Sequence, residues 1–261
     1  MFGDANKYER FMGRWSRLLA RPFLDFANVA DSGEFLDVGS GTGALAFTLA
    51  ERKPRVQVGG IDPSKEYVDY AASKNPSRDR VRFEVGDAQE LRFGDGSFDG
   101  SLSLLVFNFI PDPLKALKEL RRVTKAEGRI AAAVWDYGEG MKMLRTFWDS
   151  VVHLDPKADK LDERHMRLCR AGELSELWRQ GGLKDIEEKP IEIPMHFESF
   201  ADYWDPFLLG QGPAGAYVKS LDHLHVDALR AEVKKQISPA SEKAPFTLSA
   251  RVWAVRGTVP R

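Results

Sequence analysis

Apolar residues recur along the first half of the chain with two alternating spacings. A period of two, or a short unbroken apolar run, predicts strands at 35–38, 56–61, 81–85 and 129–135, and a fourth strand with its exit at 102–110. Spacings of three and four residues predict helices at 8–29, 44–53, 64–75 and 114–123, the first of them broken near Pro22. Because strands and helices alternate, the pattern predicts an α/β protein with a doubly wound, parallel sheet.

The order of elements changes in the second half. Amphipathic helices are predicted at 141–154 and 173–180, and strands at 186–197 and 246–255. A helical insertion at 200–237 separates these strands, and within it the glycine-rich stretch Gly210–Gly215 is expected to be a loop. Since no repeat or flexible linker divides the chain, we expect a single domain over 1–261.

Three glycines follow the first predicted strand directly. Gly39, Gly41 and Gly43 alternate with Ser40 and Thr42, and helical spacing begins at the next residue. A strand, a glycine turn and a helix in this order aim backbone N–H groups and the positive end of a helix dipole at a bound ligand. The spacing also satisfies the relaxed dinucleotide pattern G-x-G-x-x-G/A, which by itself does not choose the cofactor.

Two carboxylates near this turn narrow the choice of cofactor. Asp37 ends the strand before the turn, where it would repel a pyrophosphate and attract the ammonium and sulfonium groups of S-adenosylmethionine (SAM). Asp62, with the adjoining Pro63 and Ser64, lies about 20 residues further on, the distance at which an acid contacts ribose hydroxyls. The alternative for Asp62 is a helix cap, because Pro63 suits a first helical position.

The run Asp37-x-Gly39-x-Gly41-x-Gly43 resembles motif I of the class I SAM-dependent methyltransferases. The later run from Gly86 to Asp99 is similar to one in the type 11 group, which includes the ubiquinone and menaquinone C-methyltransferases. The resemblance implies a Rossmann-like sheet of seven mostly parallel strands with helical lid insertions, and SAM as cofactor. In it, Asp87 would accept from the adenine amino group, the Ala88 N–H would donate to the ring, and Leu105 would pack against the cofactor.

The resemblance also assigns roles to the three parts of the chain. Residues 1–30 would form an N-terminal helical lid, 31–136 the SAM-binding core, and 137–261 a C-terminal half with helical insertions and the last two strands. In the lid, Arg14 could pair with the methionine carboxylate and Tyr8 could hydrogen-bond nearby, although a solvated Arg14 beside core aromatic residues is the equal alternative.

Few residues in the sequence indicate where the methyl acceptor binds. Methyl transfer needs alignment and exclusion of water more than a strong base, and no catalytic triad, metal-ligand spacing or C-x-x-C is found. Asp136 and Tyr137 follow a predicted strand, and His196 ends another. Asn108 stands where the family often has a histidine pair. These four are candidates for acceptor contacts or catalysis, with ordinary loop or surface roles as the alternative.

Composition bears on compartment and partners. A formal net charge of −1 gives no electrostatic case for bulk nucleic-acid binding, and the longest apolar run is too short to span a bilayer. Cys169 is the single cysteine, and the N-terminal residues are charged where a signal peptide would be apolar. We therefore expect a cytoplasmic protein with a small-molecule acceptor, no nucleic-acid partner and no membrane insertion. The sequence does not indicate its oligomeric state.

The sequence is interpreted as that of a SAM-dependent small-molecule methyltransferase. An NAD-dependent oxidoreductase is the first alternative, against which Asp37, Gly43 and the Asp87–Ala88 pair argue. A nucleic-acid methyltransferase is disfavoured because 105–108 lacks the acidic-or-amide-Pro-Pro-aromatic motif. A non-catalytic SAM-binding protein remains open, because the reaction requires so few obligatory side chains.

Overall fold

The computed structural model describes residues 4–261, so the first three residues of the expected N-terminal lid lie outside the described residues. The chain divides into two compact units, each assembled from three separate stretches of sequence. One unit contains Gly13–Val134, Arg167–Ile191 and Trp253–Arg261, and the other contains the residues up to Met12, Trp135–Met166 and Glu192–Val252. The single-domain interpretation of 1–261 stays a prediction.

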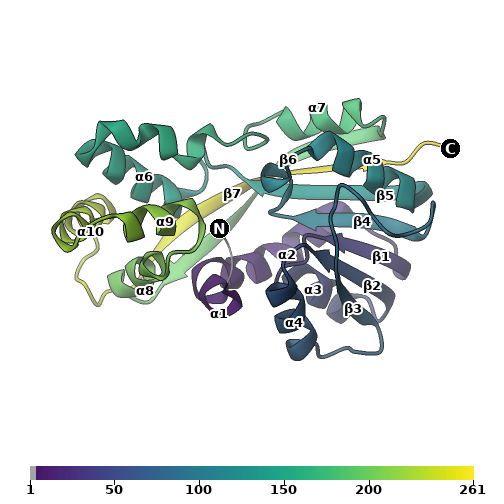
Figure 1. The fold of residues 1–261 in the computed structure, drawn as a ribbon, viewed down its shortest axis with the longest axis horizontal. Coiled ribbons are helices and arrows are strands. Elements are labelled where there is room, and N and C mark those ends of the chain that lie inside the picture. Colours follow the sequence, from purple (N-terminus) through teal and green to yellow (C-terminus); the bar gives the residue numbers. More distant parts are fainter. Residues whose placement is uncertain (1–3) are drawn as a thin grey trace. The chain divides into compact units, whose positions relative to one another are not determined.

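A seven-stranded sheet forms the framework of the fold, with strand order β3–β2–β1–β4–β5–β7–β6 (Figure 1). The strands are β1 (Ser32–Val38), β2 (Arg55–Asp62), β3 (Val81–Val85), β4 (Phe98–Leu104), β5 (Thr124–Trp135), β6 (Lys184–Phe197) and β7 (Phe246–Thr258). Strands β1 to β5 pair in parallel. This arrangement confirms the prediction of an α/β fold with a mostly parallel sheet of seven strands.

Strand β7 runs antiparallel to β5. The Glu127 N–H donates to the Val259 carbonyl and the Asp136 N–H donates to the Arg251 carbonyl, both at 2.9 Å. Residue numbers that rise along β5 therefore fall along β7. The pattern of apolar positions alone cannot show this direction, because an alternating strand has the same pattern in both orientations.

The unit that contains β1 to β4 carries helices in the order expected for crossover connections. They are α2 (Arg14–Ala27), α3 (Ala44–Arg52), α4 (Lys65–Lys74), α5 (Pro113–Val123) and α7 (Glu173–Gln180). Ile130 to Val134 of β5 are all fully buried, as a parallel strand covered on both faces should be. Helix α5 begins at a cap made by Asp112, whose side chain accepts from the Lys115 N–H.

Two boundary predictions in this unit were wrong. Helix α2 continues through Pro22, because Leu19, Phe23 and Phe26 bury one face on both sides of the proline and offset the lost backbone hydrogen bond. The fourth strand is Phe98–Leu104, so it begins before the stretch 102–110 that is predicted to hold the strand and its exit, and most of that stretch is the exit.

Small polar residues inside β4 interrupt the apolar pattern that would indicate where the strand begins. Ser101 shares a hydrogen bond of 2.7 Å with Thr124, and the Ser103 hydroxyl donates to the Val38 carbonyl at 2.9 Å. Both serines are completely buried, so hydrogen-bonded hydroxyls occupy positions where a buried strand usually has apolar residues. The strand ends because Leu105 adopts a φ of 67°, and a short 3-10 turn (Phe107–Phe109) follows.

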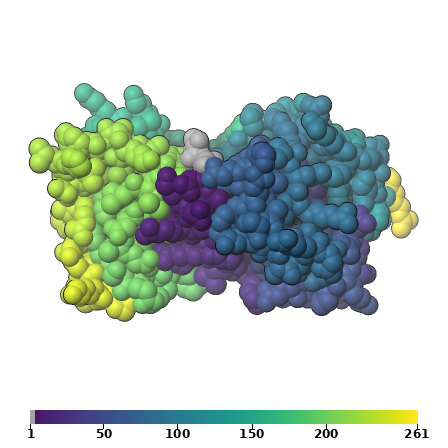
Figure 2. All heavy atoms as spheres, turned by 60° about the horizontal axis from the view of Figure 1, so that its bottom comes forward, coloured from purple at the N-terminus to yellow at the C-terminus, as the bar shows by residue number. Residues whose placement is uncertain are grey.

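The other unit is built mainly from helices and aromatic packing. Its helical segments are α1 (Ala5–Tyr8), a π-helix (Glu9–Gly13) that crosses into the first unit, α6 (Lys142–Leu154), 3-10 helices (Pro156–Leu161, Glu163–His165, Asp205–Leu209), α8 (Phe200–Trp204), α9 (Gly212–Ser220) and α10 (His223–Ile237). In Figure 2 the atoms of the stretch Glu192–Val252 are coloured from green to yellow. Phe147 and Phe207 stack at 4.6 Å between ring centroids, and Phe11 meets Phe207 edge-on.

The glycine-rich stretch in this unit is only partly the predicted loop. Gly210 ends a 3-10 helix with a φ of 76°, but α9 already begins at Gly212. Pro213 lies in the first turn of α9, where the absence of an N–H removes no helical hydrogen bond. The proline thus starts a helix in a segment whose glycines suggested irregular structure.

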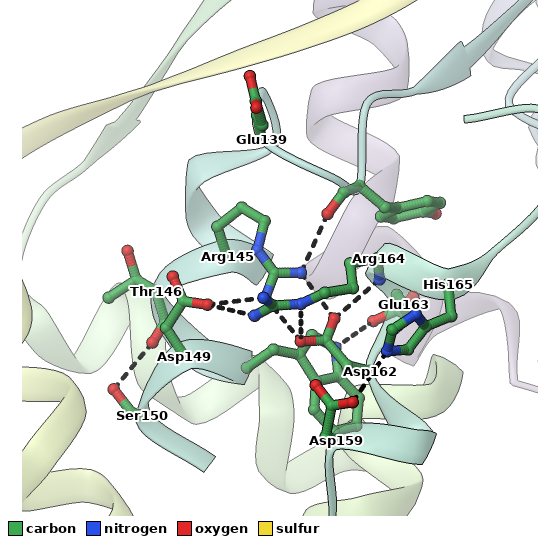
Figure 3. A network of polar contacts seen from close by, with 12 residues as sticks. Glu139, Arg145, Thr146, Asp149, Ser150, Asp159, Asp162, Glu163, Arg164 and His165 are labelled. Atoms are coloured by element: carbon green, nitrogen blue, oxygen red, sulfur yellow. Dashed lines mark hydrogen bonds and ion pairs between the residues drawn. The ribbon is translucent and has the colours of Figure 1, made fainter. Parts of the chain in front are cut away.

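A buried ionic network fixes the segment after α6 (Figure 3). The Arg145 guanidinium donates to both carboxylate oxygens of Asp162, at 2.6 and 2.7 Å, and to the Tyr137 carbonyl at 3.0 Å. The Asp162 side chain is completely buried, and Arg164 contacts it from the other side at 2.7 Å. These bonds keep the pKa of Asp162 below its usual range despite its burial.

We predict that Arg145→Met lowers the free energy of unfolding by about 3–5 kcal/mol, because it leaves the Asp162 charge buried with weaker compensation. Urea denaturation followed by circular dichroism measures the change. The control is Arg179→Met, which removes an exposed ion pair with Glu176 and should cost less than about 1 kcal/mol. Equal effects of the two substitutions would contradict the prediction.

Candidate functional site

The glycine turn at 39–43 is fastened to the end of the neighbouring strand. The N–H groups of Gly39 and Ser40 both donate to the Ile61 carbonyl at 2.8 Å, and the Gly43 N–H donates to the Ser40 carbonyl at 2.8 Å. All three glycines have positive φ, at 73°, 51° and 91°, which residues with a Cβ rarely adopt. Helix α3 starts immediately afterwards at Ala44, so its N-terminal end faces the same turn.

The glycines of this turn meet different requirements. A Cβ on Gly39 would lie 2.5 Å from the Val106 side chain, so this glycine allows the exit of β4 to pack on the turn. A Cβ on Gly41 would meet nothing closer than the Gly39 carbonyl at 4.0 Å. Gly41 is therefore the position where bare backbone borders open space and a ligand can approach.

Asp37 lies beneath this turn with one oxygen unsatisfied. Its Oδ2 accepts from the Ala46 N–H at 3.1 Å, while its buried Oδ1 has no hydrogen-bond partner among residues 4–261. Only 2% of the residue is exposed. Burial, opposed by the Ala46 hydrogen bond and helped by the nearby charge of Asp62, raises the pKa of Asp37 to about 7. An added cation or donor would relieve this buried group.

Ser40 adds a second unsatisfied atom at the same turn. Its buried hydroxyl oxygen has no partner in the described part of the chain. Buried polar groups are usually hydrogen-bonded, so two unsatisfied oxygens three residues apart mark a place where a ligand's polar atoms would fit.

Asp62 is held by backbone donors from two elements. Its Oδ2 accepts from the Gly41 N–H and its Oδ1 from the Ser64 N–H, both at 2.9 Å. The helix cap is Ser64, whose side chain accepts from the Tyr67 N–H, and α4 begins at Lys65 beyond the exposed Pro63. The capping alternative for Asp62 is thus wrong. Burial raises the pKa of Asp62, and each oxygen keeps lone-pair capacity for a further donor.

The remaining predicted core residues follow the adjacent strands. Val85 of β3 pairs with Asp62 of β2, and the exposed Asp87 and half-buried Ala88 come directly after β3. Leu105 follows β4, with its N–H donating to the Ala133 carbonyl at 2.7 Å. Since the carboxyl ends of parallel strands share one edge, the structure gathers these residues with Asp37 and Asp62 at the usual ligand edge of an open α/β sheet.

Tyr8 and Arg14, the two residues predicted to contact the cofactor from the N-terminal lid, belong to different units. Arg14 opens α2, and its guanidinium lies 4.3 Å from the centre of the Trp15 ring, a cation–π contact. Tyr8 ends α1 in the other unit. The contacts predicted between these residues and a cofactor stay predictions.

The acceptor-side candidates are not gathered in one unit. Asp136 is buried, and its Oδ2 lies 2.6 and 2.7 Å from the guanidinium nitrogens of Arg251, while its Oδ1 accepts from the Glu139 N–H. This pairing gives Asp136 a structural role. Tyr137 is buried beside it and His196 is an exposed residue next to Thr247, whereas Asn108 is buried in the unit with the glycine turn. A catalytic role for any of the four stays a prediction.

Some residues of the site could not be recognised from the sequence. Val106 packs against Gly39 of the turn, and the Ser103 hydroxyl donates to the Val38 carbonyl just before it. An apolar-polar pattern does not indicate either contact. Across residues 4–261, no group of three or more His, Cys, Asp or Glu side chains is placed to hold a metal ion. No helix in that range is both long and apolar enough to cross a membrane.

Comparison with known proteins adds an independent line of evidence. Residues 36–132 match the family model described as "Methyltransferase domain". A malonyl-[acyl-carrier protein] O-methyltransferase from Geobacter sulfurreducens is 30% identical over 186 residues, which cover 70% of this chain and 68% of that protein. A ubiquinone/menaquinone biosynthesis C-methyltransferase from Geotalea uraniireducens is 32% identical over 132 residues, 49% of this chain and about half (52%) of its own length.

Solved structures share the fold at lower identity. The YcgJ protein of Bacillus subtilis has a TM-score of 0.59 and 20% identity, over 93% of this chain and 98% of its own. A phosphoethanolamine N-methyltransferase from Haemonchus contortus, solved with S-adenosylhomocysteine, has a TM-score of 0.61 and 18% identity, over 98% of this chain and 57% of its own. These likenesses support the fold alone.

We predict that the Asp37 carboxylate destabilises the ligand-free protein as the pH rises. Its folded-state pKa of about 7 lies above the value of 3.8 expected for an aspartate in the unfolded chain, so stability is lost as the pH rises between about pH 4 and pH 7. The full difference is roughly 4 kcal/mol. Asp37→Asn keeps an acceptor for the Ala46 N–H and should unfold at higher urea than wild type at pH 8, but not at pH 4.

The matched control is Asp69→Asn, on the exposed side of α4, where the carboxylate only pairs with Lys65. It should leave the pH dependence of unfolding unchanged. A wild-type protein whose stability does not fall relative to Asp37→Asn between pH 4 and pH 8 would disprove the assignment.

Proposed function

The chain belongs to the SAM-dependent methyltransferases, and we propose that it transfers a methyl group from SAM to a small-molecule acceptor. The proposal is carried by one observation: a buried carboxylate oxygen of Asp37 without a partner, beneath a turn that is open at Gly41. A diphosphate cofactor would place negative charge against this acid. A cofactor with cationic groups there would instead offset the cost of burying it.

The residues present fit the functional groups of SAM. Asp37 suits its cationic methionine portion, and the Asp62 carboxylate suits the two ribose hydroxyls, since both its oxygens retain acceptor capacity. Asp87 would accept from the adenine amino group and the Ala88 N–H would donate to the ring. Leu105 would provide apolar contact, with Gly39, Ser40, Gly43, Pro63 and Ser64 forming the surrounding backbone.

SAM supplies an electrophilic methyl group on a sulfonium leaving group. The contribution of this chain is to bind the cofactor in one orientation, hold the acceptor in line and exclude water. Asp136 is engaged by Arg251, so we do not assign it as a base. The reaction then needs a general base only for acceptors that are protonated at the working pH.

The acceptor is proposed to be a small organic molecule. One relative is named as a ubiquinone/menaquinone biosynthesis C-methyltransferase and another as a malonyl-[acyl-carrier protein] O-methyltransferase. The aromatic side chains outside the SAM-binding core suit an acceptor with apolar surface. A near-neutral net charge does not favour nucleic acid, and a chain with one buried cysteine suits the reducing cytoplasm.

Calorimetric titration with SAM, S-adenosylhomocysteine and NADH tests the cofactor. We expect the first two to bind and NADH not to bind. Asp62→Asn should weaken binding of both by roughly 10- to 100-fold, because charge-assisted hydrogen bonds become neutral ones. The control is Asp95→Asn, an exposed carboxylate that pairs with Arg122. NADH binding in the absence of SAM binding would favour the oxidoreductase alternative.

The affinity for SAM should rise with pH. With the pKa of Asp37 at about 7, the charged form that attracts the cofactor grows from a minor to the major species between pH 6 and pH 7.5. The dissociation constant should fall several-fold across this range, in which the ligand's ammonium group stays mostly charged. Asp37→Asn should bind more weakly with a flat profile. An equally flat wild-type profile would contradict the role of Asp37.

Turnover distinguishes an enzyme from a binding protein. Incubation with SAM labelled in the methyl group and a fractionated metabolite pool should transfer label to a small molecule, and the labelled product would identify the acceptor. Binding of SAM without any transfer of label would support the non-catalytic alternative.

A further inference from the structure

We propose that Gln89 is a positioning residue that orients the Asp87 carboxylate for recognition of the adenine amino group. The inference rests on the proposed function, because it concerns the adenine end of the same cofactor site. The evidence for it is a set of hydrogen bonds between Gln89 and the Asp87 carboxylate, within the unit that contains the glycine turn.

Gln89 contacts the Asp87 carboxylate through both its backbone and its side chain. The Gln89 backbone N–H donates to Asp87 Oδ1 at 2.8 Å. The side-chain Nε2 lies 3.1 Å from Oδ1 and 3.2 Å from Oδ2, and so bridges the two oxygens. An exposed aspartate otherwise rotates freely about its broad terminal torsion, so these contacts select one orientation.

The other end of the Gln89 amide is fixed to a helix cap. Its Oε1 accepts from the Asp112 N–H at 2.9 Å, and Asp112 in turn caps α5 by accepting from the Lys115 N–H at 2.9 Å. Arg167 steadies the same segment by donating to the Pro111 carbonyl at 3.0 Å. The donor NH₂ must therefore face Asp87, because the carbonyl end of the amide is occupied by a backbone N–H.

This arrangement leaves capacity for a ligand. A carboxylate offers about four lone-pair directions, of which Gln89 uses two on Oδ1 and one on Oδ2. The remaining direction on Oδ2 is suited to an exocyclic amino group. An arginine in this position would neutralise the charge of the carboxylate. The neutral amide of Gln89 holds the carboxylate without neutralising it, so Asp87 remains a strong acceptor.

The test compares S-adenosylhomocysteine with its 6-deamino analogue, in which hydrogen replaces the adenine amino group. We expect Gln89→Met to weaken binding of S-adenosylhomocysteine roughly 10-fold, as one charge-assisted hydrogen bond loses its alignment. Binding of the analogue should change less than roughly 2-fold, because it never used that bond. Calorimetric dissociation constants for the full chain provide the measurement.

The control is Gln180→Met, which removes an exposed side-chain amide that donates to Glu176 and should affect neither ligand. Gln89→Glu is the second variant, and its charge opposite Asp87 should reduce discrimination between the ligands at least as much. Adding Gln89→Met to the Asp87→Asn variant should weaken binding of S-adenosylhomocysteine little further, since the group that Gln89 positions has already been changed.

Equal losses for both ligands in the Gln89 variants would mean that the residue only stabilises the local turn, and would overturn the inference. So would additive losses in the Asp87→Asn, Gln89→Met double variant. A wild-type protein that binds neither S-adenosylhomocysteine nor SAM would instead refute the proposed function itself.

Discussion

The burial of the Asp37 carboxylate is the constraint around which the site is arranged. An acid with an unsatisfied oxygen inside a protein is unfavourable, and it is tolerated only where the surrounding structure is rigid enough to prevent rearrangement. That rigidity comes from the sheet: Asp37 pairs with Gly60 in the parallel register of β1 and β2, and the Ile61 carbonyl binds two N–H groups of the turn.

Glycines at contact points make this arrangement possible. A Cβ on Gly60 would lie 2.5 Å from the Phe83 ring and 3.0 Å from the Ser40 Cβ, so a larger residue would push the turn away from β2. Gly39 likewise admits Val106. The turn is thus packed against the protein on one side and open at Gly41, where a ligand could hydrogen-bond to the oxygens of Asp37 and Ser40 that lack a partner within the described residues.

Much of the fold could be predicted because its signals are local. The strand–glycine–helix order at 35–50, the spacing of Asp62 and the amphipathic pattern of α5 each follow from a few neighbouring residues. The start of β4 at Phe98 could not be predicted, because the hydrogen-bond partners of Ser101 and Ser103 lie on other strands. The continuation of α2 through Pro22 likewise depends on tertiary burial, which outweighs local propensity.

The candidate site shows the same difference between local and tertiary signals. Positions that a motif determines, such as Asp37 and Asp87, could be named in advance, because the motif carries its own geometry. The supporting contact of Gln89 with Asp112 joins segments 23 residues apart and becomes visible only in three dimensions. Acceptor residues are harder still, since methyl transfer imposes alignment and leaves the side-chain chemistry free.

The interleaving of the two units has a consequence for how such a protein can change. Each unit is built from three stretches of sequence, so no single recombination event could exchange one of them intact. New specificity must therefore arise by point substitution and by growth or shrinkage of loops within a shared framework, and a grafted fragment from a relative would have to match at several junctions at once.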